Sequence, residues 1–176
     1  MSKALLQALR PHQWVKNLLV FVALVFDHRL GEWSSVRSAL MAFAVFCLLS
    51  SSVYLLNDVI DREADRAHPR KRNRPVASGA LPVPVALLGS LLAAGGAVGW
   101  GFAMSDFARP GLPFVALPIA YLVLQLGYSF LLKTMLIVDC LCIALGFLFR
   151  VHAGSVALVD VKSSSWLLLC TFFFSL

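Results

Sequence analysis

Long apolar runs separated by short polar segments dominate the chain. A helix needs about 20 mostly apolar residues to cross a hydrocarbon core of about 30 Å. Several runs reach that length, and the first does so only if its helix extends from about Trp14 to about Leu30. The pattern predicts an all-α, polytopic membrane bundle with about five transmembrane helices, at residues 17–26, 39–56, 83–104, 112–132 and 135–158.

A sixth apolar run begins at Trp166, and the sequence stops 11 residues later, at Leu176. At about 1.5 Å per residue this length covers about half of a membrane crossing. We therefore expect residues 1–176 to form a single membrane domain that is the N-terminal portion of a longer bundle. Gly95 and Gly99, four residues apart in the third run, predict a face on which helices pack closely.

The number of charged residues is typical of a membrane protein, and their positions predict which side of the membrane each loop faces. Only 14% of residues are charged, and the mean hydropathy is +0.83, which excludes an ordinary soluble domain. Basic residues mark cytoplasmic loops, and they alternate with loops poor in them, so we expect a cytoplasmic N-terminus in the cell (inner) membrane. The two basic segments carry Lys3, Arg10 and Lys16, and then Arg62, Arg66, Arg70, Lys71, Arg72 and Arg74.

Three aspartates lie where the second apolar run ends. If its helix continues past residue 56, Asp58, Asp61 and Asp65 fall within a stripe about 60° wide, with Asn57 one turn before Asp61. Like charges at this spacing repel one another, and Mg²⁺, which prefers oxygen ligands, would offset that repulsion. The four residues are therefore a candidate metal site. The alternative is a solvated helix end whose acids pair with nearby arginines, Arg62 and Arg66.

These motifs resemble a known family. Asn57-Asp58-x-x-Asp61-x-x-x-Asp65, followed by Lys71-x-Asn73-Arg74-Pro75-x-x-x-Gly79, is similar to the first signature of the UbiA superfamily of intramembrane prenyltransferases. Other segments resemble the branch of that superfamily that makes decaprenylphosphoryl-5-phosphoribose. They are Arg10-Pro11-His12-Gln13-Trp14-x-Lys16-Asn17, Tyr128-Ser129-x-x-x-Lys133, Asp139 and Gly146-x-x-x-Arg150-x-x-Ala153-Gly154.

The resemblance implies a helical bundle, typically of nine membrane helices, whose aspartates hold Mg²⁺ on a diphosphate that departs during transfer. The catalytic residues would be Asp58, Asp61 and Asp65, which with Asn57 would also hold the metal. The expected partners are a polyprenyl lipid, a diphosphate-containing donor and membrane lipid, without nucleic acid. The residues expected to bind substrate are Lys16, Asn17, Asn57, Arg74, Lys133, Asp139 and Arg150.

Alternatives remain open at this point. The transferred group is 5-phosphoribose from phosphoribosyl diphosphate in one reaction and an isoprenyl group, passed to an aromatic acceptor, in the other. Lys16 suits either phosphate binding or snorkelling to the interface, and Arg150 either substrate binding or structural pairing. The remaining basic cluster, Arg70, Lys71 and Arg72, also suits contact with anionic lipid. A non-catalytic carrier, a lipid-binding bundle or an inactive fragment would carry the same charges.

Overall fold

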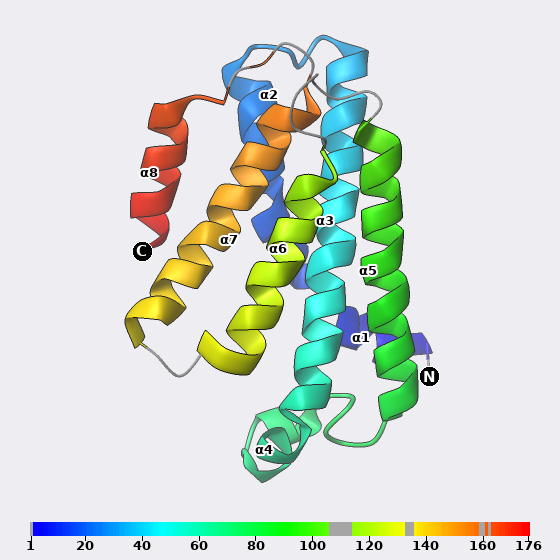
Figure 1. Cartoon of the computed structure of the whole chain (residues 1–176). Coiled ribbons are helices and arrows are strands. Elements are labelled where there is room, and N and C mark those ends of the chain that lie inside the picture. Colours follow the sequence, from blue (N-terminus) through cyan, green and yellow to red (C-terminus); the bar gives the residue numbers. More distant parts are fainter. Residues whose placement is uncertain (1, 106–113, 133–135, 159–160, 162) are drawn as a thin grey trace.

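A computed structural model of the chain describes residues 2–105, 114–132, 136–158, 161 and 163–176, and these are mostly helical (Figure 1). The elements in chain order are α1 (Ser2–Leu9), η1 (Pro11–Phe21), α2 (Val22–Phe26), α3 (Trp33–Ile60), α4 (Arg62–Ala67), η2 (Lys71–Asn73), α5 (Val83–Ser105), α6 (Ala116–Gly127), η3 (Tyr128–Leu132), α7 (Leu136–Ala157) and α8 (Ser165–Ser175). The prediction of an all-α membrane bundle is therefore confirmed.

Three helices in the described part of the chain are long and apolar enough to cross a membrane, namely α3, α5 and α7. They match the runs predicted at 39–56, 83–104 and 135–158. Two shorter apolar helices follow the other predictions, α6 within 112–132 and α8 at the partial sixth run. Part of the 112–132 run lies outside the described residues.

The first predicted span has a different structure. Residues 11–21 form a 3₁₀ segment, η1, and only the five residues of α2 are α-helical. Pro11 begins η1, and Arg10 before it has a left-handed backbone, with φ of 52°. The apolar run is also interrupted by Asn17, which is fully buried and bonded to other elements, so packing rather than hydropathy sets the local geometry.

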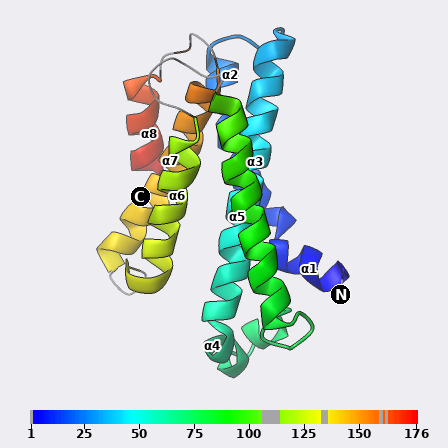
Figure 2. The same cartoon turned by 45° about the vertical axis from the view of Figure 1, so that its right-hand side comes forward.

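The helices α3 and α5 lie side by side along the bundle, with α6 and α7 next to them and α8 outermost beside α7 (Figures 1 and 2). Buried serines join the first pair: the Ser90 hydroxyl donates to the Ser52 carbonyl oxygen at 2.9 Å, and the two hydroxyl oxygens are 3.1 Å apart. The short helix α4 covers one end of the bundle, and α1 lies near that end (Figure 1). Apolar side chains from η1, α3, α5, α6 and α7 form the main core, with Phe46 and Tyr121 packed edge to face.

Gly154 is a point at which α7 and η1 approach closely. A Cβ atom built on Gly154 would collide with the backbone carbonyl of Val20 in η1. The pair Gly95 and Gly99 is different, since a Cβ on either residue would meet no atom within 4 Å. Within the described residues, no other helix therefore packs closely against Gly95 and Gly99, although close packing was predicted there. The glycine of α5 that lies close to α3 is Gly89, which contacts the Leu55 side chain.

We expect Gly154→Ala to lower the free energy of unfolding by about 1–3 kcal/mol, because the added methyl group forces η1 away from α7. The matched substitution Gly95→Ala has room for its methyl group and should be neutral or stabilising by up to about 1 kcal/mol, because alanine favours the helix. Unfolding by SDS in mixed micelles, followed by circular dichroism, measures both. Equal effects of the two substitutions would contradict the close approach seen here.

Candidate functional site

The acidic motif lies where α3 passes into α4. Asp58 is on the last turn of α3, Asp61 stands at the break between the helices, and Asp65 is on α4. Helical hydrogen bonding continues across the break, because the Asp61 amide donates to the Asn57 carbonyl and the Asp65 amide to the Asp61 carbonyl, both at 2.8 Å. The helix therefore continues past residue 56, as the grouping of the aspartates assumed, although α3 ends at Ile60 and α4 begins at Arg62. Asp58 and Asp65 are 1% and 2% exposed, so both carboxylates need partners inside the protein.

Two arginines from separate segments supply these partners. The Arg74 Nη1 atom is 2.7 Å from Asp65 Oδ2 and 3.5 Å from Asp58 Oδ1, so this side chain bridges the two carboxylates. Arg10, which precedes η1, donates from Nη2 to Asp58 Oδ1 at 2.5 Å. Its guanidinium also lies over the Tyr54 ring, 4.9 Å from the centroid. The site therefore joins the N-terminal segment, the end of α3 and the loop after η2.

The arginines nearest in sequence do not pair with these aspartates in any ion pair that the structure records. Arg66 Nη1 is 3.1 Å and Arg62 Nη1 is 3.9 Å from Glu63 Oε1, on the exposed side of α4. The alternative of a solvated helix end paired with Arg62 and Arg66 is therefore wrong for Asp58 and Asp65. Arg10 was missed as their partner, although it begins the N-terminal motif that the resemblance singled out.

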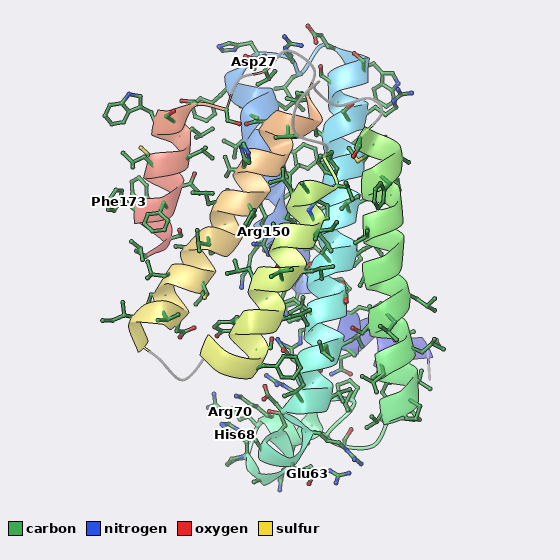
Figure 3. The ribbon with its side chains drawn as sticks, viewed as in Figure 1. Asp27, Glu63, His68, Arg70, Arg150 and Phe173 are labelled. Carbon is green, nitrogen blue, oxygen red and sulfur yellow. The ribbon has the colours of Figure 1, made fainter. Side chains whose placement is uncertain are left out.

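A cavity of about 320 Å³ opens beside Asp58. Three arginine side chains line it together with polar groups, so its walls suit an anion more than an apolar ligand. Figure 3 shows Arg70 at the end of the bundle that also carries Glu63 and His68. The lining residues are Gln7, Arg10, His12, Asp58, Arg70, Asn73, Arg74 and Pro75.

The acidic residues fit a magnesium ion in their chemistry, but not as a closed set of protein ligands. Within the described ranges, no three His, Cys, Asp or Glu side chains lie close enough together to hold a metal. However, Asp58 Oδ2 is buried without a hydrogen-bond partner among the described residues. Mg²⁺ is often bound by one or two carboxylates with the remaining ligands from water and substrate phosphate, which matches this arrangement.

A second polar cluster lies deeper in the bundle, around Arg150 of α7. Its side chain is 7% exposed and donates from Nε to Asn17 Oδ1 at 2.7 Å, from Nη1 to the Gly146 carbonyl at 2.5 Å and from Nη2 to the Tyr121 hydroxyl at 2.9 Å. Asn17 in turn donates to the Ser50 hydroxyl at 3.2 Å. Figure 3 shows Arg150 about midway along the bundle, between Asp27 at one end and Arg70 at the other.

The other predicted site residues divide between the two regions. Lys16 is exposed and lines a cavity of about 140 Å³ with Arg150. Asn57 is half-buried at the acidic end of α3, and Asp139 is half-buried on the first turn of α7, with its Oδ1 atom unbonded among the described residues. Lys133 lies outside the described residues. The sequence analysis did not predict Tyr121 as a site residue, because the sequence shows only that it lies in an apolar run.

The model of the UbiA prenyltransferase family matches residues 18–176. The chain belongs to the UbiA prenyltransferase family. Curated relatives agree with this assignment. A decaprenyl-phosphate phosphoribosyltransferase of Corynebacterium glutamicum is 38% identical over 100% of this chain and 52% of its own length. Another of the same name from Mycolicibacterium smegmatis is 40% identical over 98% of this chain and 53% of its own length.

A solved structure supports the UbiA fold. The UbiA homolog from Archaeoglobus fulgidus, bound to DMAPP and Mg²⁺, superposes with a TM-score of 0.78 at 20% sequence identity. The match covers 97% of this chain and 59% of that one. By the coverages of the two curated relatives given above, this UbiA family member spans about half of their length.

We expect Arg10→Gln to lower the free energy of unfolding by about 2 kcal/mol, because the buried Asp58 carboxylate loses its shortest bond. The control Arg72→Gln removes the same charge from an exposed side chain and should change stability by less than about 0.5 kcal/mol. Adding Asp58→Asn to Arg10→Gln should recover part of the loss. SDS unfolding of all four variants, including Asp58→Asn alone, gives the coupling energy; a coupling near zero would contradict the ion pair.

Proposed function

We propose that this chain, as one membrane domain, provides the donor and metal site of a Mg²⁺-dependent transferase. The enzyme moves 5-phosphoribose from phosphoribosyl diphosphate to a polyprenyl phosphate and releases diphosphate. The observation that carries the proposal is the buried Asp58 carboxylate, with one oxygen unbonded, in a cavity lined by Arg10, Arg70 and Arg74. The names of the relatives at 38% and 40% identity favour this donor and this acceptor.

The chemistry requires stabilisation of departing diphosphate. The bond between the anomeric carbon and the diphosphate oxygen breaks, and a phosphate oxygen of the lipid forms the new bond to that carbon. Asn57, Asp58, Asp61 and Asp65 would hold Mg²⁺, which neutralises charge on diphosphate as it leaves. The arginines of the cavity add preorganised positive charge at the same place.

The arginine contacts also suit a site that exchanges one set of partners for another. Arg74 forms ion pairs with both Asp65 and Asp58. With Mg²⁺ held by the carboxylates, Arg74 and Arg10 would be free to donate to the phosphate oxygens of the donor. Each charged side chain would then still have an opposite charge beside it.

Transfer of an isoprenyl group to an aromatic acceptor is the second candidate. The Archaeoglobus fulgidus homolog was solved with DMAPP and with GPP, each with Mg²⁺, and both are allylic diphosphates. Asp58 and its neighbours would serve that donor in the same way. At 20% identity this likeness shows the fold alone, so the more similar relatives favour the ribosyl reaction.

The proposed site faces the cytoplasm. The basic residues of the N-terminal segment and of residues 62–74 favour that side for α4 and the acidic end of α3. The opposite end of the bundle, near Asp27, then lies on the far side of the membrane (Figure 3). A water-soluble donor such as phosphoribosyl diphosphate reaches the cavity from the cytoplasm in this orientation.

The test measures transfer from labelled phosphoribosyl diphosphate to a polyprenyl phosphate in detergent, by this chain alone and by this chain joined to the remainder of the Corynebacterium glutamicum relative. We expect metal-dependent product from the joined protein, lowered at least about 100-fold by Asp58→Asn or Asp61→Asn, because loss of a group that stabilises the transition-state charge costs about this much. Arg72→Gln, which lies outside the cavity, should retain activity.

An allylic diphosphate with an aromatic acceptor forms the comparison reaction. A folded protein that converts the allylic diphosphate and the aromatic acceptor, but shows no activity with phosphoribosyl diphosphate, would contradict the ribosyl proposal and support prenyl transfer. Activity unchanged by EDTA, or by both aspartate substitutions, would contradict the metal role. Folding of each variant is checked by circular dichroism and size-exclusion chromatography.

A further inference from the structure

Arg150 is a buried cation without an acidic partner. Its recorded bonds go to neutral oxygen atoms, those of Asn17, Gly146 and Tyr121, and no ion pair to Arg150 is found in the described part of the chain. A charged side chain within an apolar bundle is costly, and one that is retained there marks a pathway or a binding site for opposite charge. Arg150 differs in this respect from Arg10 and Arg74, which are neutralised by carboxylates.

The guanidinium also retains donors for a ligand. Arginine has five N–H groups, and three of the Arg150 nitrogens each make one bond, which leaves one N–H on Nη1 and one on Nη2. The Arg150 side chain, which carries these two N–H groups, lines the cavity of about 140 Å³. Lys16 lines the same cavity and has no ion pair among the described residues, so two positive charges border a small polar space.

An apolar groove adjoins this cavity. The groove encloses about 570 Å³ between η1, α2, α7 and α8, and Phe147 lines both the groove and the cavity of Arg150. Figures 1 and 2 both show α8 running beside α7. The walls of the groove include Leu19, Val22, Leu167, Cys170 and Phe174.

We propose that this cavity and groove together bind the polyprenyl phosphate acceptor. The phosphate head lies between Lys16 and Arg150, and the isoprenoid chain passes Phe147 into the groove. The inference rests on the proposed function and assigns the acceptor to a place separate from the metal site. Charge complementarity selects a phosphate, and the adjoining apolar walls select one that carries a hydrocarbon chain rather than a free phosphate or a sugar phosphate.

The position of the cavity suits the reaction. Ser50 and Tyr54 of α3 line the Arg150 cavity, and Asp58, one turn beyond Tyr54, lines the arginine cavity of the donor. Tyr54 also lies against Arg10, so this ring stands between the two regions. The acceptor phosphate would therefore lie beside the donor along α3, toward the interior of the bundle.

The experiment uses a farnesyl phosphate probe with a photoactivatable diazirine on its chain and this chain in phosphatidylcholine nanodiscs. Label is mapped by mass spectrometry. We expect it to be enriched in η1, α2 and α8 relative to the exposed leucines of α5, Leu88, Leu91 and Leu92, which report contact with bulk lipid. Unlabelled farnesyl phosphate should compete, whereas farnesol, inorganic phosphate and phosphoribosyl diphosphate should not.

Lys16→Gln and Arg150→Gln should each weaken this competition about tenfold, because each removes a charged hydrogen-bond donor from the phosphate. Arg150→Lys should restore part of it, and Arg72→Gln should leave it unchanged. Arg150→Gln also breaks three structural bonds, so its thermal unfolding is measured; Lys16→Gln breaks no recorded bond and tests the site even if the Arg150 variant fails to fold.

Equal competition by farnesol, or competition that is unaffected by Lys16→Gln, would overturn the phosphate site. Label spread evenly over η1, α8 and α5 would overturn the groove. The labelling and transfer experiments distinguish failure of this inference from failure of the proposed function. Phosphoribosyl transfer without specific labelling removes the acceptor site and leaves the function, whereas specific labelling without transfer leaves a polyprenyl phosphate site and removes the function.

Discussion

The cost of placing charge inside an apolar bundle governs this structure. Asp58, Asp65 and Arg150 are nearly or fully buried, and each is stabilised only because other groups approach it closely. The partners of Asp58 and Arg150 come from distant parts of the sequence: Arg10 is 48 residues from Asp58, and Asn17 is 133 residues from Arg150. Polar bonds inside the bundle therefore fix how the N-terminal segment packs against α3 and α7.

The N-terminal segment is shaped by these bonds. The Trp14 indole donates to the Ser51 hydroxyl at 3.0 Å, and that hydroxyl donates to the Leu9 carbonyl at 3.0 Å, so α3 holds both sides of the turn at Arg10. Asn17 connects the same segment to α7 through Arg150, and Gly154 allows the two backbones to come together. A regular helix at residues 11–21 would direct these polar side chains differently, which accounts for the 3₁₀ geometry of η1.

Hydropathy predicted α3, α5 and α7 because each is long enough for its composition to decide its structure. The first predicted span, residues 17–26, is instead divided between the 3₁₀ segment η1 and the short helix α2, and polar side chains bonded to distant helices set its geometry. The spacing of Asp58 and Asp65 correctly placed both on one helical path, since that relation is local. Their pairing with Arg10 depends on how the chain folds back, and a single sequence carries no local signal for it.

Arg74 shows why a residue that contacts acids in this state remains a phosphate ligand in the proposed reaction. Two carboxylates and two guanidinium groups make Asp58, Asp65, Arg10 and Arg74 electrically neutral as a group. In the proposed reaction Mg²⁺ would add positive charge and diphosphate negative charge, so the two together would leave little uncompensated charge in the protein. Either one alone would leave carboxylates or arginines without partners in a poorly solvated place, which is costly. On this proposal, the arrangement of two carboxylates and two guanidinium groups would favour binding of metal and diphosphate together over binding of either one.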